Sequence, residues 1–73
     1  MEAFHYTMII EWDDRDNIFV VTIPEFTGCK THGDTYEEAV KNGKEVIELC
    51  IEAEQALGNP LPQPHTYHHS YAA

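Results

Sequence analysis

The sequence predicts an α+β fold in which one long helix packs against a three- or four-stranded, mainly antiparallel sheet, in the order β-β-β-α-β. Two stretches near the N-terminus are rich in β-branched and aromatic residues, and a short polar segment separates them. One later stretch has apolar residues at helical spacing, and a Pro-rich segment follows it. The 73 residues are expected to form a single domain, with residues 1–64 as its core and residues 65–73 as a C-terminal strand or tail.

The first two strands are expected at Ala3–Trp12 and Ile18–Ile23. The polar run 13–17 between them favours a turn, because its short side chains hydrogen-bond their own backbone, so the pair forms an antiparallel hairpin. The second strand is apolar on both faces, which predicts a helix over one face and a second subunit over the other. The alternating pattern of the first strand places five apolar residues on one face: Phe4, Tyr6, Met8, Ile10 and Trp12.

A third strand is expected at Cys29–Gly33, after Pro24 has ended the second, because proline has no N–H for the ladder. The helix begins with a capping-box pattern at Thr35 and Glu38. The Thr35 hydroxyl is expected to accept from the amide of Glu38, whose carboxylate is expected to reach back to the Thr35 amide.

The helix is expected from Tyr36 to Leu57. Gly43 lies on its apolar stripe and predicts close approach of helix to sheet, and Gly58 is suited to the position after the cap. The side chains expected to be buried on this helix are Val40, Val46, Ile47, Cys50 and Ile51. Those expected beneath it, or their sheet neighbours, are Met8, Ile10, Phe19 and Val20.

The charge balance excludes several functions. Thirteen acidic residues against four basic ones give a net charge of −9, which argues against nucleic acid and against anionic membranes. The same charge favours a basic partner. The sequence contains no apolar run of about 20 residues and no signal-peptide pattern at its N-terminus, so a cytoplasmic location is expected. Cys29 and Cys50 lack the close spacing of metal or redox pairs and are expected to be reduced core residues.

The combined pattern resembles the HicB-like antitoxin family. Matching segments are residues 24–29 and 31–39, together with the Pro-rich exit 58–64. The resemblance implies a domain similar to a partly degraded ribonuclease H fold, without a working active site, that binds a small basic HicA-like toxin and blocks its cleavage of messenger RNA. The family-pattern positions, expected to be structural, are Pro24, Gly28, Gly33, Asp34, Thr35, Glu38 and Ala39.

One departure from the family concerns DNA. Many members carry a C-terminal ribbon-helix-helix or helix-turn-helix module, and residues 65–73 could not form one. Direct binding to nucleic acid is therefore not expected.

The acidic residues around the first turn allow three interpretations. They could hold Mg²⁺ in a hydrolase, they could be a solvated turn, or they could meet the basic surface of a toxin. A metal site needs carboxylates that converge in a cleft, and these lie close together in sequence at a turn. A magnesium site is therefore not expected, and the turn is either solvated or makes partner or subunit contacts, for which the candidate residues are Glu11, Trp12, Asp13 and Asp14.

The C-terminal segment is unusual for a solvated end, since it carries Tyr67 and Tyr71 and no acidic or basic side chain other than histidine. Tyrosine is common at interfaces, so the segment is either a contact with a partner or subunit, or a frayed end. The five histidines do not suggest a site with three or four convergent ligands. No catalytic residue, metal or cofactor is expected.

The function predicted from the sequence is that of a non-enzymatic antitoxin that binds and neutralises a small basic HicA-like toxin. Self-association as a dimer or tetramer is also expected, because a chain of this length has a thin core. The alternatives are an orphan structural or regulatory homo-oligomer with no toxin, and a hydrolase that uses the acidic turn.

Overall fold

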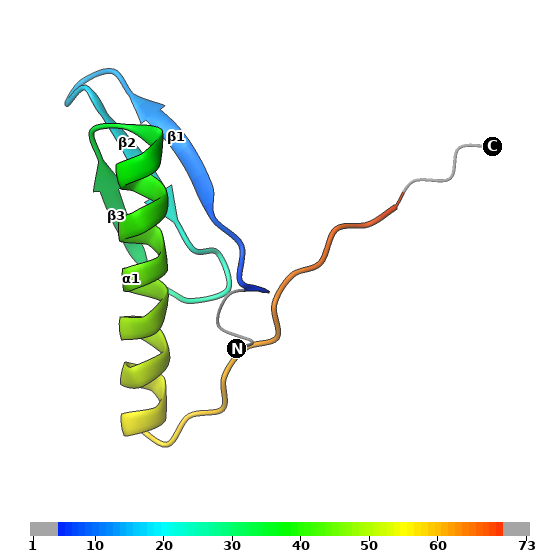
Figure 1. Ribbon diagram of the computed structural model, residues 1–73. Coiled ribbons are helices and arrows are strands. Elements are labelled where there is room, and N and C mark those ends of the chain that lie inside the picture. The colour runs from blue at the N-terminus through cyan, green and yellow to red at the C-terminus, as the bar shows by residue number, and fades with distance from the viewer. Residues whose placement is uncertain (1–4, 70–73) are drawn as a thin grey trace.

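A computed structural model describes residues 5–69 and shows one sheet and one helix (Figure 1). Strands β1 (Ile9–Asp13), β2 (Ile18–Thr22) and β3 (Lys30–Gly33) are followed by helix α1 (Tyr36–Ala56). The sheet is antiparallel in the order β1-β2-β3, and α1 lies along one of its faces. This arrangement confirms the α+β fold.

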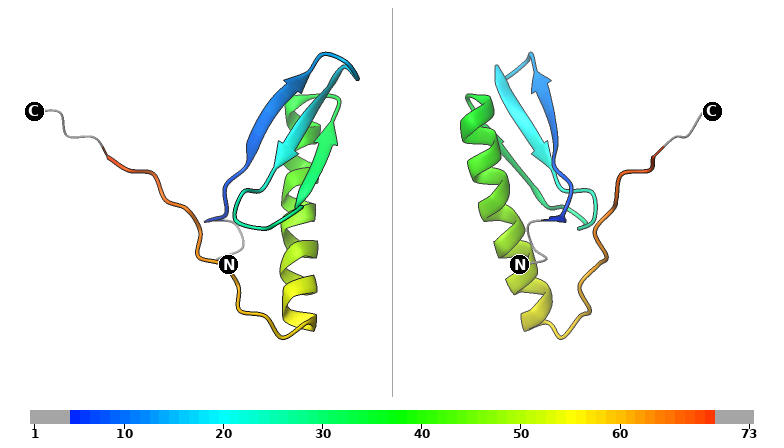
Figure 2. Two further views of the ribbon diagram at one scale, coloured as in Figure 1. Left: turned by 180° about the vertical axis from the view of Figure 1, so that it is seen from behind. Right: turned by 45° about the vertical axis from the view of Figure 1, so that its right-hand side comes forward.

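Of the two forms expected for the C-terminal segment, a strand or a tail, the strand is not formed by residues 65–69. After α1 the chain runs as an extended segment that turns away from the sheet (Figures 1 and 2). Prolines at 60, 62 and 64 cannot donate to a ladder, and the amide of His65 donates to a side chain instead of a strand. Tyr71, like Ala3 and Phe4 at the other end, lies outside the described residues.

The first strand is shorter than expected, because the residues before Ile9 are held by side chains. Tyr6 is only 8% exposed, and its hydroxyl donates a 2.6 Å hydrogen bond to the carbonyl of Pro62. Its ring meets that of Phe26 edge-on, with centroids 4.9 Å apart. These contacts with two distant segments replace strand pairing at this end of the sheet.

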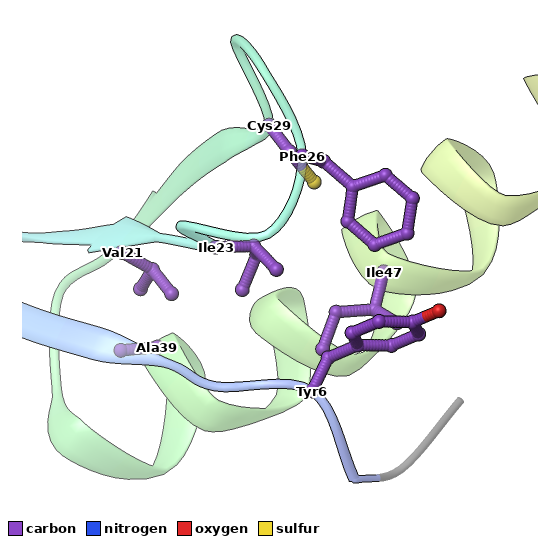
Figure 3. Packing of buried hydrophobic residues seen from close by; sticks show 7 residues of the cluster. All are labelled: Tyr6, Val21, Ile23, Phe26, Cys29, Ala39 and Ile47. Carbon is purple, nitrogen blue, oxygen red and sulfur yellow. The ribbon is translucent and has the colours of Figure 1, made fainter. Parts of the chain in front are cut away.

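The hydrophobic core lies between the sheet and α1, and Figure 3 shows its members. Val21, Ile23 and Ile47 are the largest fully buried side chains. Val21 therefore lies beneath the helix where Val20 had been expected. Side chains alternate along a strand, and Val20 pairs with Glu11 and His32 on the opposite face. The buried cluster is completed by Tyr6, Phe26, Cys29 and Ala39, with Met8, Ile10, Phe19, Val46, Cys50 and Ile51 packed against it.

Val40 departs from the expected buried face of α1. It remains 37% exposed, because it lies beside the stripe formed by the buried residues Ala39, Gly43 and Ile47. The expectation that Val40 is buried was therefore wrong.

Both ends of α1 are capped as the sequence indicated, except that one capping hydrogen bond has a different donor. The Thr35 hydroxyl accepts from the amide of Glu38 at 3.0 Å, which confirms the cap. The Glu38 carboxylate accepts from the amide of Asp34, where the amide of Thr35 had been expected. At the other end Gly58 has φ of 73° and its amide donates to the carbonyl of Gln55, as in a Schellman motif.

Two glycines set how closely α1 approaches the sheet. A Cβ on Gly43 would lie 2.7 Å from the Sδ of Met8, which confirms the expected close approach. A Cβ on Gly33 would lie 2.5 Å from the amide nitrogen of Ala39 and 2.8 Å from its Cα. The end of β3 therefore touches the backbone of the first helical turn.

The two cysteines are joined as a disulfide, so the expectation of reduced thiols was wrong. Cys29 precedes β3, and Cys50 lies on the face of α1 that packs on the core. Their Cα atoms are 6.6 Å apart, within the range that a disulfide can span. The two residues are 21 positions apart, and it is the packing of the helix that brings them together.

Candidate protein-binding surface

The acidic residues at the β1–β2 turn line one hollow on the surface of the protein. It has a volume of about 370 Å³. All four residues expected from the sequence to make contacts here are in its lining, and Arg15 and Val20 complete it. The lining residues are Glu11, Trp12, Asp13, Asp14, Arg15 and Val20.

Asp13 fixes the shape of the turn. Its Oδ1 accepts from the amide of Arg15 at 2.9 Å and from that of Asp16 at 3.4 Å. Asn17 takes up a left-handed conformation with φ of 56°, which asparagine tolerates better than most residues. The turn is therefore held by its own hydrogen bonds, which leave Asp14 and Arg15 exposed.

An aromatic row runs from this hollow to the start of α1. Trp12 meets Phe19 edge-on with ring centroids 5.0 Å apart, and Phe19 stacks on Tyr36 at 4.3 Å. Phe19 is partly buried, whereas Trp12 is 54% exposed and Tyr36 is 64% exposed. The row thus presents two large rings to solvent, one on the edge strand and one on the helix. Trp12 belongs to both the row and the acidic hollow.

A second hollow, of about 660 Å³, begins at Tyr36 and continues along α1. Its charges are mixed, because Lys41 and Lys44 lie among three glutamates. It is therefore less strongly negative than the acidic hollow. The lining residues are Tyr36, Glu37, Val40, Lys41, Lys44, Glu45 and Glu48.

Glu25 is a shielded carboxylate that the sequence pattern did not single out. Its side chain has no exposed surface. It accepts from the amide of Thr7 at 3.1 Å, from the Thr7 hydroxyl at 2.8 Å and from the amide of His65 at 2.8 Å. Glu25 therefore joins the segment before β1 to the segment after α1.

The hydrogen bonds to Glu25 decide its ionisation. Burial alone would raise the pKa of Glu25, but the donors on His65 and Thr7, together with its own backbone amide, hold that pKa below the ordinary value. Nearby, burial and the negative charge of Glu25 raise the pKa of Tyr6. At neutral pH Glu25 is thus a charged acceptor and Tyr6 a neutral donor.

The tyrosines of the C-terminal segment are not brought to the acidic hollow. Tyr67 is 81% exposed and meets His69 edge-on at 5.0 Å. The segment projects sideways from the sheet and does not reach the β1–β2 turn (Figures 1 and 2). Tyr71 lies outside the described residues. The contacts expected from the sequence therefore fall on two separate surfaces.

The family-pattern residues lie in the connections between elements and at the start of α1. Pro24 and Gly28 belong to the connection between β2 and β3, where Gly28 has φ of 75°. The other five, around the start of α1, are Gly33, Asp34, Thr35, Glu38 and Ala39. Their contacts with one another, described above, are backbone packing and capping.

Neither a metal site nor a membrane span is seen in the part of the chain that the structure covers. Between residues 5 and 69, no three His, Cys, Asp or Glu side chains lie close enough together to hold an ion. Over the same residues, no helix has the length and apolar character to cross a bilayer.

The fold and this surface define a small acidic α+β domain that presents exposed aromatic rings at one end. The family model for HicB-like antitoxins of bacterial toxin–antitoxin systems matches residues 6–73, and the chain belongs to that family. This confirms the resemblance carried by the sequence motifs. Membership suggests an antitoxin role and implies a toxin partner in general terms.

Several relatives support the assignment. A UPF0150 protein of Synechocystis, ssr1765, is 37% identical over 85% of this chain and 77% of its own length. A UPF0150 protein of Thermoplasma acidophilum, Ta0767, is 40% identical over 80% of this chain and 83% of its own length. No solved structure gave a significant match.

Proposed function

We propose that this protein is an antitoxin that binds a small basic HicA-like toxin and neutralises its cleavage of messenger RNA. The observation that carries the proposal is the position of Trp12, which is 54% exposed in a hollow that also contains Glu11, Asp13 and Asp14. An exposed tryptophan among carboxylates suits a partner that offers lysine or arginine side chains. The ring face attracts the cation, and the carboxylates pair with it.

The protein on this proposal acts without catalysis. It covers the toxin surface with the acidic hollow and the aromatic row. The charge of −9 draws a basic partner in from solution, while exposed aromatic rings are the kind of side chain that carries much of the binding energy at interfaces. Binding to nucleic acid and to membranes is not part of the proposal, and the site of action is the cytoplasm.

The proposal is tested by sequencing the neighbourhood of this gene and co-expressing the protein with any small basic open reading frame found there. The wild-type protein is expected to restore growth and to co-purify with the toxin. Trp12→Ala is expected to weaken binding by about 2 kcal/mol or more, the usual threshold for a central contact. Leu49→Ala is the matched control, because Leu49 is also large and 62% exposed but lies outside both hollows.

Two outcomes would reject the proposal. In the first, no toxic neighbour exists or this protein does not relieve the toxicity. In the second, the toxin binds Trp12→Ala and Leu49→Ala equally well, which would move the interface elsewhere.

A second function is favoured by the unpaired edge of the sheet. Within the described residues β1 pairs only with β2, and its Ile9 and Trp12 are 41% and 54% exposed. An unpaired strand edge with exposed apolar side chains is a surface that proteins usually cover. A homo-oligomer would cover it without any toxin, and sedimentation of the purified protein distinguishes this possibility from a monomeric antitoxin.

A further inference from the structure

The extended segment that follows α1 is the most unusual part of the described structure, and we name residues 58–69 the C-terminal arm. Two contacts anchor its first half to the body, one from Tyr6 to Pro62 and one from Glu25 to His65. Beyond His65 the arm projects away from the sheet (Figures 1 and 2). These two hydrogen bonds therefore fix the point and the direction in which the second half of the arm leaves the body.

The arm carries a different charge from the body. All 13 acidic and all four basic side chains of the protein lie before residue 57, and the arm has neither kind. Two bodies of charge −9 repel each other, whereas an arm without carboxylates approaches a second body without that penalty. The charge distribution thus favours contact between an arm and a body over contact between two bodies.

The second half of the arm has the shape and side chains of an added strand. It is extended, and Tyr67 and His69 lie on the same side of it, with ring centroids 5.0 Å apart. Its four residues after His65 span roughly 13 Å at the usual rise of a strand. That length matches most of β1, which has five residues.

The edge of β1 offers what such a strand needs. On its outer side the described residues provide no neighbouring strand, so its backbone groups can pair with a peptide laid along it. Ile9 and Trp12 are exposed along the same strand. Tyr67 is 81% exposed, and a tyrosine ring buries well against a tryptophan or isoleucine side chain.

We propose that two copies of this chain exchange arms, with residues 66–69 of each copy added as a strand to the β1 edge of the other. The arm emerges on the β1 side of the sheet (Figure 1), so one two-fold operation places both arms at once and closes the assembly at a dimer. This inference rests on the self-association offered above as the second function, and the arm would compete with a toxin for Trp12, which both would cover.

The test is sedimentation equilibrium of the full chain at neutral pH. The wild-type protein is expected to be a dimer. Tyr67→Asp, which places a carboxylate against an acidic body, is expected to raise the dimer dissociation constant roughly tenfold or more. Tyr67→Phe keeps the ring and is expected to remain dimeric. Gln63→Asp adds the same charge to the exposed first half of the arm and is the matched control.

Hydrogen exchange locates the interface in the same samples. Those amides of residues 9–13 that do not pair with β2 are expected to be protected in the wild-type dimer and to lose protection in Tyr67→Asp, while the far-ultraviolet circular dichroism stays unchanged.

Three results would overturn the proposal. A wild-type protein that is monomeric at about 100 μM, far above the dissociation constants of stable dimers, would reject self-association. A monomer would also be found if the arm paired with β1 of its own chain, so that arrangement counts against the proposal as well. A dimer that Tyr67→Asp leaves intact, or that Gln63→Asp weakens equally, would keep self-association and reject arm exchange. A dimer in which the outward-facing amides of β1 stay unprotected would place its interface on another surface.

Discussion

The amide of His65 donates a 2.8 Å hydrogen bond to the carboxylate of Glu25, 40 residues earlier in the chain. Glu25 lies just after β2, and His65 lies nine residues beyond the end of α1. The same carboxylate holds Thr7 in front of β1. The buried carboxylate of Glu25 therefore joins three segments by hydrogen bonds: the one before β1, the one after β2 and the one after α1. No strand pairing connects these segments.

This arrangement predicts a loss of stability in acid. The pKa of Glu25 is lower in the folded protein than in the unfolded chain, so the folded state favours the ionised carboxylate. Its contribution is complete above the ordinary glutamate pKa and is lost as pH falls through the lowered folded value. Urea unfolding followed by circular dichroism at pH 7 and pH 3 measures the loss.

Glu25→Gln isolates this contribution. At pH 7 we expect it to lower the free energy of unfolding by about 2 kcal/mol, since hydrogen bonds to a charged group are among the stronger ones. Its stability should then change less than that of the wild type between pH 7 and pH 3. An equal change in both proteins would show that other carboxylates cause the acid sensitivity.

Gly33→Ala tests the contact between β3 and α1. The added Cβ would lie within 3 Å of the backbone of Glu38 and Ala39, and backbone cannot move aside as a flexible side chain can. We expect a loss of about 3 kcal/mol in the free energy of unfolding, the upper end for overpacking. Gly58→Ala is the comparison, because a Cβ there meets nothing and only the positive φ is unfavourable. It should cost about 1 kcal/mol, and a smaller loss for Gly33→Ala than for Gly58→Ala would contradict the packing argument.

The start of α1 gives a third prediction. Thr35→Ala removes the hydroxyl that accepts from the amide of Glu38 and should lower the free energy of unfolding by about 1 kcal/mol. Thr27→Ala, at an exposed position in the connection between β2 and β3, serves as a control for loss of a threonine. Equal losses for both variants would indicate that the cap contributes nothing specific.

The disulfide between Cys29 and Cys50 gives a fourth prediction. It joins residues 21 positions apart, and its reduction should lower the free energy of unfolding by about 3 kcal/mol. The comparison uses the protein with and without a reducing agent. A double Cys29→Ala, Cys50→Ala variant should be insensitive to the reducing agent. Two titratable thiols in the native protein, purified without reducing agent, would contradict the bond.

The acidic turn gives a fifth prediction, which concerns rates. In Asp14→Asn with Asp16→Asn, association with the basic toxin should slow and its salt dependence should weaken, while dissociation changes little. Long-range attraction acts mainly on encounter, and neither side chain makes a hydrogen bond that holds the turn together. Glu52→Gln, on the exposed part of α1, is the control for loss of charge. Equal slowing per charge removed in both variants would assign the effect to net charge and not to the turn.

The local features of the fold were predictable from the sequence. The Thr35 cap, the Gly58 ending and the hairpin each depend on residues within a few positions of one another, and the structure confirms all three. The length of the first strand was not predictable in this way. Tyr6 fits the alternating pattern of a strand, but its hydroxyl donates a hydrogen bond to the carbonyl of Pro62, 56 positions along the chain.

The candidate surface was predictable only in part. The four expected residues from Glu11 to Asp14 do line one hollow, because they are consecutive along a strand and its turn. Tyr36 and Phe19 join them only through the packing of α1 on the sheet. Glu25 and the Cys29–Cys50 pair gave no usable signal, because each depends on residues 18 to 40 positions apart that meet after the core has formed.

Trp12 is the single tryptophan of the chain, and it lies on the candidate surface instead of in the core. Since Trp12 is already 54% exposed in the folded protein, unfolding should shift its fluorescence emission less than it would for a buried tryptophan. Coverage by a toxin or by a second copy would remove water from the ring and shift its emission to shorter wavelength. The fluorescence of Trp12 thus reports whether this surface is occupied, but it is poorly suited to following the folding of the protein.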